Sequence, residues 1–181
     1  MRFAVIPAQA GIQFATLMLA LLPALAGAGT TTEIPAAAVP QMADRIVIEK
    51  AQRRLNLYAH GRRIAQFVVA LGQSPVGRKQ CAGDNRTPEG YYFVSGRKED
   101  SSFHRALRLS YPSPEDRGRA EAQGCEPGGD IMIHGLKEDW GKDSRFHVLH
   151  DWTRGCVAVT NEEIEQIWAM VPDGAEVEIL P

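Results

Sequence analysis

The chain has 181 residues, a formal net charge of −2 at pH 7 and an isoelectric point near 6.2. This balance excludes the basic surface that a nucleic-acid partner requires, so no nucleic acid is expected. The sequence also lacks the basic amphipathic helix with which proteins bind a membrane surface.

The first 28 residues have the layout of a secretory signal peptide. An uncharged apolar run, 14–22, is too short to span a bilayer as a helix, and small residues suited to cleavage follow at 24–26 and 26–28. Arg2 is the only charge before this run and the lead-in is long, so an uncleaved anchor or a misassigned start codon is the alternative. Residues 29–44, rich in Thr, Ala and Pro, are predicted to be a tether. We therefore expect export to the periplasm or cell envelope.

Residues 45–181 have the size of one domain, and their pattern predicts a mostly β fold. The first runs alternate apolar and polar residues around a His60-Gly61 turn, which is typical of an antiparallel meander. Loops rich in Gly, Pro, Asp and Ser separate the remaining runs, as in β-sandwiches and barrels. The predicted strands are 45–50, 54–58, 63–71, 91–95, 106–111, 131–133 and 175–180.

One main α-helix is predicted near the C-terminus. Thr160 and Glu163 have the spacing of a capping box. An apolar stripe with helical spacing follows it: Ile164, Ile167, Trp168 and Val171. Earlier in the chain, 117–122 is predicted to add only a helical turn to the long 112–129 loop. That loop is either one wall of a substrate groove or a surface excursion.

Three cysteines in an exported chain suggest one disulfide and one free thiol. Cys81 and Cys125 lie in Gly-rich loops, whereas Cys156 lies between a glycine turn and a β-branched run. We therefore predict a Cys81–Cys125 disulfide and a free Cys156. Three unpaired thiols are the alternative, because the sequence does not give the geometry that a disulfide needs.

Cys156 is the candidate nucleophile. It follows Arg154-Gly155, where a thiol can be exposed, beside a cation and near free backbone N–H groups, which are conditions that favour a thiolate. His134, at the end of a predicted strand, is the candidate base. The N–H groups of Arg154, Gly155 and Cys156 are the candidate oxyanion hole, because the glycine permits a tight turn. The competing interpretation of Cys156 is a small core residue.

Three further side chains near this motif are candidates for substrate binding: Trp140, His150 and Trp152. The two tryptophans are predicted to be walls of a groove or, alternatively, lids that pack over a small β core. A zinc site would combine the histidines of this region with the thiol or the base: His147, His150 and either Cys156 or His134. Their spacing matches no common zinc pattern, so we expect no metal and no cofactor.

Three motifs occur in order along the chain: Gly83-Asp84 with Thr87-Pro88-Glu89-Gly90-Tyr91, then Ile131-Met132-Ile133-His134-Gly135, then Thr153-Arg154-Gly155-Cys156-Val157. Together they resemble the catalytic domain of the L,D-transpeptidases (the YkuD-type domain) of bacterial cell-wall metabolism, over roughly 46–180. The resemblance implies a mostly β, sandwich-like fold. It also implies that Cys156 is the nucleophile, that His134 is its base, and that the backbone carbonyl of Gly135 orients the imidazole.

The resemblance further implies a substrate and a reaction. Members of the family attack a peptidoglycan stem tetrapeptide at the L-configured centre of its diamino acid, release D-Ala and pass the acyl group to an amine. Many members carry an arginine two residues after the cysteine, where this chain has Ala158. The run from Asp151 to Ile164 instead resembles the YafK-type branch, in which at least one activity is an amidase that releases peptidoglycan-linked lipoprotein.

We therefore predict a cysteine-dependent peptidoglycan L,D-transpeptidase whose substrates are stem peptides. An amidase or hydrolase of the same fold acting on a peptidoglycan-linked lipoprotein is the first alternative. A catalytically silent wall-binding module would keep the fold and the affinity for the wall but leave Cys156 unreactive. A zinc hydrolase using His134, His147 and His150 is the third alternative, and a chelator would abolish only that activity.

Overall fold

The computed structural model describes residues 41–137, 140 and 144–181. The predicted signal peptide, 1–28, and most of the predicted tether, 29–44, lie outside the described residues. Ala43 is buried and its N–H donates to the carbonyl of Met170, so this residue already belongs to the packed domain. None of the helices in the described ranges is long and apolar enough to cross a membrane.

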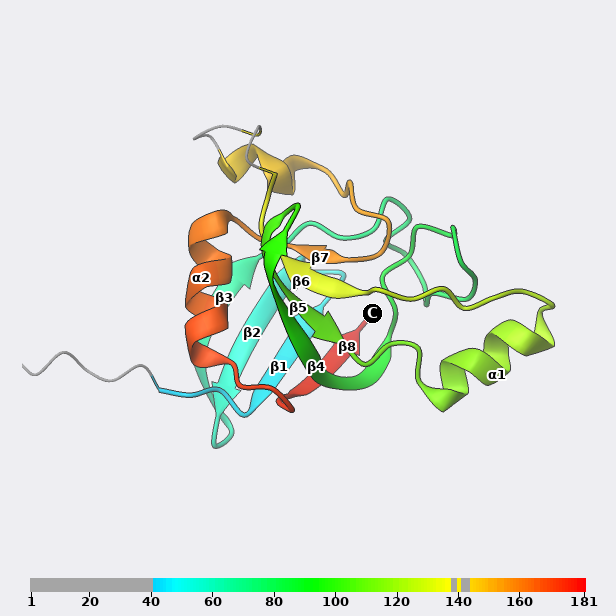
Figure 1. Ribbon diagram of the computed structural model, residues 1–181, viewed down its shortest axis with the longest axis horizontal. Helices are drawn as coiled ribbons and strands as arrows, with labels where there is room; N and C mark the ends of the chain where they lie inside the picture. The colour runs from blue at the N-terminus through cyan, green and yellow to red at the C-terminus, as the bar shows by residue number, and fades with distance from the viewer. Residues whose placement is uncertain (1–40, 138–139, 141–143) are drawn as a thin grey trace, which may run out of the picture. The chain divides into compact units, whose positions relative to one another are not determined.

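Within the described residues, the strands form one continuous sheet in the order β3-β2-β1-β8-β4-β5-β6-β7 (Figure 1). β1, β2 and β3 are the predicted antiparallel meander, and β8 lies beside β1 and parallel to it. The mostly β fold is thus confirmed. The strand bounds are β1 (Arg45–Glu49), β2 (Arg54–Ala59), β3 (Arg62–Val68), β4 (Gly90–Ser101), β5 (His104–Leu109), β6 (Met132–His134), β7 (Val157–Ala158) and β8 (Glu176–Leu180).

The long strand β4 joins the two halves of this sheet. Its first residues, 90–93, pair with β8. From Val94 onwards the strand pairs with β5, and the register of that pairing shifts between Val94 and Gly96. β5 then pairs with β6, and β6 runs parallel to β7. Side chains from both halves contribute to one apolar core, as expected of a sandwich-like fold. Among them are Ile46, Leu55, Leu57, Leu107, Ile133, Val157 and Ile179.

Helix α2 (Asn161–Met170) is the predicted C-terminal helix. The Thr160 hydroxyl accepts a hydrogen bond from the N–H of Glu163 at 3.1 Å, and the Glu163 carboxylate accepts one from the N–H of Thr160 at 2.8 Å. The helix buries Ile164 and Ile167 against β5 and β6. The capping box therefore sets the start of the helix immediately after the motif that contains the free cysteine.

Helix α1 (Pro114–Ala122) is longer than the single turn predicted at 117–122. Ser113 caps it: its hydroxyl accepts from the N–H of Asp116, whose carboxylate accepts in return from the N–H of Ser113. The usual capping-box pattern has Glu or Gln at this third position, so an aspartate there weakened the sequence signal. The Tyr92 hydroxyl donates to the same carboxylate and connects α1 to β4.

The predicted disulfide between Cys81 and Cys125 is present, and Cys156 is the free thiol. Next to the disulfide, the N–H of Ala82 donates to the carbonyl of Glu126. The segment that follows α1 is therefore tied to the loop that precedes β4. That segment leads into β6, so the disulfide also limits the movement of the chain on its way to the strand that carries His134.

Candidate active site

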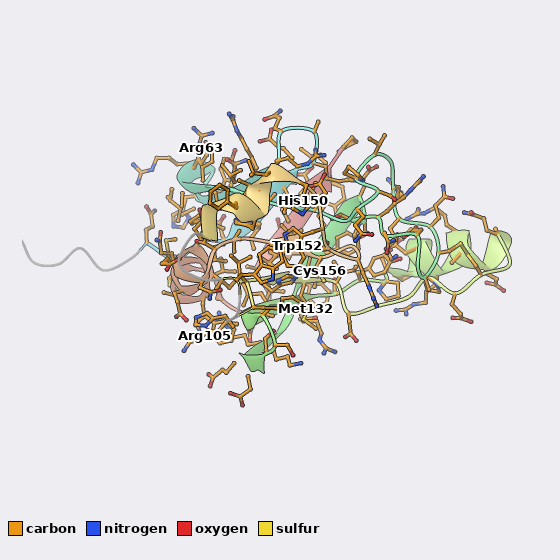
Figure 2. The ribbon with its side chains drawn as sticks, turned by 90° about the horizontal axis from the view of Figure 1, so that it is seen from above. Arg63, Arg105, Met132, His150, Trp152 and Cys156 are labelled. Atoms are coloured by element: carbon orange, nitrogen blue, oxygen red, sulfur yellow. A yellow bond between two sulfur atoms is a disulfide. The ribbon has the colours of Figure 1, made fainter. Side chains whose placement is uncertain are left out.

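A pocket of about 420 Å³ contains both His134 and Cys156. His134 is the last residue of β6, and Cys156 directly precedes β7. In the parallel ladder Ile133 lies opposite Val157 and His134 opposite Ala158, so Cys156 is level with Met132. The side chains of His134 and Cys156 therefore project from the same face of the sheet. Figure 2 shows Cys156 between Met132 and Trp152. The lining residues are Phe103, His134, Lys137, Trp140, Trp152, Thr153, Arg154 and Cys156.

The thiol of Cys156 is protonated at neutral pH. Its sulfur donates to the carbonyl oxygen of Asp130 across 3.5 Å. Burial raises the pKa of Cys156, and the Asp130 carboxylate raises it further, while a hydrogen bond from the backbone of Met132 and the charge of Lys79 oppose these effects. The expectation that the surroundings of this cysteine would favour a resting thiolate is therefore wrong, because desolvation of the sulfur outweighs the nearby positive charge.

The turn before Cys156 is held by Thr153. Its hydroxyl donates to the carbonyl of Cys156 at 2.7 Å and accepts from the N–H of Gly155 at 3.1 Å. Gly155 has a φ of +129°, and a Cβ there would lie 2.7 Å from the carbonyl oxygen of Arg86. The glycine is therefore required, as predicted. Its N–H already has an acceptor, which leaves the N–H groups of Arg154 and Cys156 as the candidates for an oxyanion hole.

His134 is buried and neutral. Its Nδ1 lies 2.7 Å from the carbonyl oxygen of Gly135. A carbonyl only accepts, so Nδ1 carries the hydrogen and Nε2 keeps its lone pair. Burial lowers the pKa of His134, against the opposite effect of the bond to Gly135. The imidazole is thus held as a base at neutral pH, with the carbonyl partner that the family resemblance implied.

Gly135 allows three segments to meet beneath this histidine. A Cβ at this position would lie 2.5 Å from Oδ1 of Asn161 and 3.0 Å from the carbonyl oxygen of Phe103. The same Asn161 Oδ1 accepts from the N–H of Leu136 at 2.7 Å, which joins the first residue of α2 to the turn after β6. No local sequence pattern marks Asn161 for this contact, because its partner, Leu136, is distant along the chain.

Aromatic side chains form the pocket walls. The rings of Trp140 and Trp152 are 4.7 Å apart, and the Phe103 ring lies 4.5 Å from the His134 ring. The Lys137 ammonium lies 5.6 Å from the centre of the Phe103 ring. Both tryptophans line the pocket at the predicted place, and their role in binding stays a prediction. Phe103 and Lys137 were not anticipated.

His150 is exposed and is not among the described residues that line the pocket, so the structure does not bring it together with the two tryptophans, and its role in binding stays a prediction. It follows the 3-10 helix η2 (Ser144–Leu149), whose last residue is also exposed. His147 is the buried histidine of this segment, and burial, with a smaller contribution from the neighbouring His134 when that imidazole is protonated, lowers the pKa of His147 to about 4. Across the described ranges, no group of three or more His, Cys, Asp or Glu is placed to hold a metal ion.

An ion pair anchors the chain just before the pocket. The Asp151 carboxylate accepts from Nε and Nη2 of Arg53, at 3.1 and 2.7 Å, and also from the N–H of Leu71 at 2.9 Å. The N–H of Thr153 donates to the carbonyl of Leu71 as well. The cysteine turn is therefore fixed to the segment that follows β3. Sequence patterns gave no sign of this distant contact.

The fold and this pocket characterise a catalytic domain with a cysteine and a histidine at the end of a mostly β sheet. The family model of the L,D-transpeptidase catalytic domain, YkuD, matches residues 43–179. The chain belongs to this family of enzymes, and the predicted resemblance is confirmed.

A curated relative agrees with this membership, and solved structures share the fold. "Putative L,D-transpeptidase YafK" of Escherichia coli is 30% identical over 132 residues, which are 70% of this chain and 46% of that protein. The chain thus spans about half the length of the curated relatives it matches. Pgp2 of Campylobacter jejuni, described as a helical cell shape determining protein, has a TM-score of 0.58 at 24% identity, covering 77% of this chain and 48% of Pgp2. Bd1075 of Bdellovibrio bacteriovorus has a TM-score of 0.52 at 21% identity, with 78% and 51% covered. These structures support the fold.

Proposed function

We propose that this protein is a cysteine-dependent peptidoglycan L,D-transpeptidase. Cys156 would attack the carbonyl at the L-centre of the diamino acid in a stem tetrapeptide and displace D-Ala. An amine of a second stem, of a lipoprotein lysine or of a free D-amino acid would then take the acyl group. The single observation that carries the proposal is the pocket shared by a free thiol and a neutral, buried histidine, in a chain of the L,D-transpeptidase family.

The protonation states favour general-base catalysis over a resting ion pair. His134 takes the thiol proton at Nε2 as the sulfur attacks, and the hydrogen bond from Nδ1 to Gly135 stabilises the imidazolium that forms. The N–H groups of Arg154 and Cys156 are the proposed donors to the oxyanion. Collapse of the tetrahedral intermediate breaks the C–N bond, and the imidazolium returns the proton to the departing D-Ala amine. The acceptor amine then loses its proton to His134, and the thiolate recovers it as the thioester breaks.

The charges of the pocket suit a substrate that carries carboxylates. Among the lining residues that the structure describes, the charged ones are Lys137 and Arg154, and none is Asp or Glu. Ala158, where many family members have an arginine, is fully buried and forms a bridge to Ala70, so this position offers no side chain to a substrate. We infer that Lys137 and Arg154 supply the positive charge for the stem peptide in its place.

The alternative acceptor is water. The resemblance of residues 151–164 to the YafK-type branch and the small buried Ala158 make a hydrolase that releases a peptidoglycan-linked lipoprotein the second candidate. Hydrolysis would use the same acyl-enzyme and differ only in the group that resolves it. If Cys156 proves unreactive, the protein would instead be a catalytically silent module that binds the cell wall. Export to the periplasm or cell envelope is part of the proposal, and the Cys81–Cys125 disulfide supports it because disulfides persist in oxidising compartments.

The test is the intact mass of the protein after mixing with a disaccharide-tetrapeptide muropeptide, with Cys156→Ala as the control. An adduct that needs Cys156, together with release of D-Ala, supports the acyl-enzyme. Cross-linked dimers among the products support the transpeptidase, and a tripeptide product supports the hydrolase. If neither this substrate nor a lipoprotein-linked muropeptide gives an adduct or a product, the enzymatic proposal fails.

A further inference from the structure

Two neighbouring aromatic side chains are exposed on β4, away from the active site. Tyr91 and Phe93 are 78% and 51% exposed and alternate with the buried Tyr92 and Val94, so they project from the same outer face of the sheet. They line a cavity of about 610 Å³, which we call the outer groove. It lies between the outer face of β1, β8 and β4 and the segment that leads into α1 (Figure 1), and shares no lining residue with the pocket of Cys156.

The polar side chains of one wall are already fixed in place. The Glu178 carboxylate lies 3.9 Å from the Arg45 guanidinium. Arg45 in turn lies over the Tyr58 ring, 5.1 Å from its centre. These contacts run across adjacent strands, so the wall is organised before any ligand arrives, which lowers the entropy cost of binding.

The opposite wall adds charges of both signs. Glu115 and Arg117, from the first turns of α1, line it. The outer groove therefore presents two arginines together with acidic side chains, and no field of a single sign. Of the five charged side chains that line it, three would repel an anionic ligand and two would repel a cationic one. A purely apolar ligand would bury several of them without hydrogen-bond partners, which is costly.

A sugar chain fits both features of the outer groove. One face of a pyranose ring presents C–H groups that pack flat on aromatic rings, and its hydroxyl and amide groups accept from arginine and donate to carboxylates. The volume also lies within the range of ligand sites, about 300–1,000 Å³. We propose that the outer groove binds an uncharged amino-sugar glycan, with Tyr91 and Phe93 as the stacking platform.

The identification of this sugar as the glycan strand of peptidoglycan rests on the proposed function. The outer groove would hold the strand while the separate pocket of Cys156 acts on a stem peptide. Glycan binding is a property of the groove alone, and it can therefore be measured without turnover.

The experiment is a calorimetric or NMR titration of the Cys156→Ala protein with an N-acetylglucosamine tetramer. The double variant Tyr91→Ala/Phe93→Ala, made in the same background, should bind at least about tenfold more weakly, because both stacking surfaces are lost. Val68→Ala is the matched control, since Val68 is also 51% exposed but lies on β3, and it should bind like the parent. Arg117→Ala, which leaves the sheet intact, should weaken binding by a smaller factor.

Kinetic measurements with two substrates then distinguish an effect on glycan binding in the outer groove from an effect on the reaction at Cys156. In the protein that retains Cys156, the double variant should raise KM for glycan-linked stems and leave turnover of a free tetrapeptide unchanged. If neither substrate reacts, the proposed function fails while the titration still decides the glycan site. Absence of tetramer binding, or equal binding by the parent and the double variant, overturns the glycan site. Self-association of the parent that the double variant loses would overturn it too, because a second copy would then occupy the outer groove.

Discussion

The two ends of the sheet are built in different ways. At one end, β1, β2, β3 and β8 have five to seven residues each, with long ladders, of which that between β2 and β3 shifts register once, and a shared apolar core. At the other end, β6 has three residues and β7 has two. Polar side chains hold the backbone there: Asp151, Thr153 and Asn161 each bond to main-chain groups around the pocket.

This contrast separates the source of stability from the source of catalytic geometry. Burial of apolar side chains stabilises the meander, where no single backbone position needs to be exact. In the pocket, the thiol and the imidazole must meet to within a fraction of an ångström, and specific hydrogen bonds and two tightly enclosed glycines position them. Substitutions in the first region should therefore reduce stability, and substitutions in the second should reduce activity.

The largest effect is expected for His134→Gln. Removal of the base should slow acylation by about 10²–10⁴-fold, because the pKa of the Cys156 thiol is raised and no thiolate is available near pH 7. Glutamine keeps much of the volume and a hydrogen-bond donor. Measured acylation rates with a muropeptide test this, alongside thermal unfolding to show that the variant is folded.

The pH dependence of thiol alkylation tests the protonation states of His134 and Cys156 on which this prediction depends. In the native protein the lowered pKa of His134 keeps the base neutral below its ordinary value of about 6.5, and the raised pKa of Cys156 keeps the thiol protonated above its ordinary value of about 8.5. Alkylation by iodoacetamide should therefore rise only on the alkaline side of that value. A rate that is already maximal at pH 6 would show a resting ion pair and contradict this assignment.

In the meander, Leu57→Ala should have the opposite effect: a loss of stability with little change in activity. Leu57 is fully buried in β2, opposite Ile46 of β1 and Ala65 of β3, so truncation leaves a cavity and should cost about 2–5 kcal/mol of unfolding free energy. Urea denaturation measures this loss. Acylation of the folded variant should stay within about twofold of the parent. A fall in rate comparable to that of His134→Gln would show that the two regions are coupled.

Much of the regular half of the molecule was predictable because its signals are local. Alternating residues identified β1 and β2, and the Thr160–Glu163 capping box identified α2. The second half of β4 was missed because its residues after Gly96 are mostly charged and lack the alternation of a half-buried strand. β3 was predicted to continue to Leu71, but the chain leaves that ladder after Val68 and bonds to the cysteine segment instead.

The chemistry of the site was only partly predictable. The family motifs placed Cys156 and His134 in one site, and the structure has them on neighbouring strands, with His134 the last residue of β6 and Cys156 directly before β7. The protonation state of the thiol was not predictable, since burial depends on segments far apart in the sequence. Phe103 and Lys137 reach the pocket from the β4–β5 turn and from the segment after β6, and no local pattern marks either residue. His150 was assigned from its proximity in sequence, and it is not among the described residues that line the pocket, so its role in binding stays a prediction.

Two glycines provide a sharper test of the pocket. In Gly135→Ala the new Cβ would clash with Asn161 and with the carbonyl of Phe103, so the turn beneath His134 must shift. We expect a loss of about 1–3 kcal/mol in stability and a fall in acylation rate of at least about tenfold. Gly96→Ala in β4 is the matched control, because a Cβ there meets nothing within 4 Å. Equal rates for the two variants would mean that the backbone around Gly135 does not position the base.

The smallest effects are expected when an ion pair next to the pocket and an ion pair on the surface are each broken and the two variants are compared. Asp151→Asn removes the charge that holds Arg53 but keeps an oxygen for the N–H of Leu71, so we expect a cost of about 1–2 kcal/mol and a several-fold slower acylation. Asp173→Asn breaks the Arg97 pair, whose carboxylate is 62% exposed, and should change stability by less than about 0.5 kcal/mol. Urea denaturation and acylation rates compare the two variants. If both cost the same and neither slows the reaction, the anchor at Asp151 contributes only surface electrostatics, and the rigidity of the cysteine turn must come from Thr153 and the enclosed glycines alone.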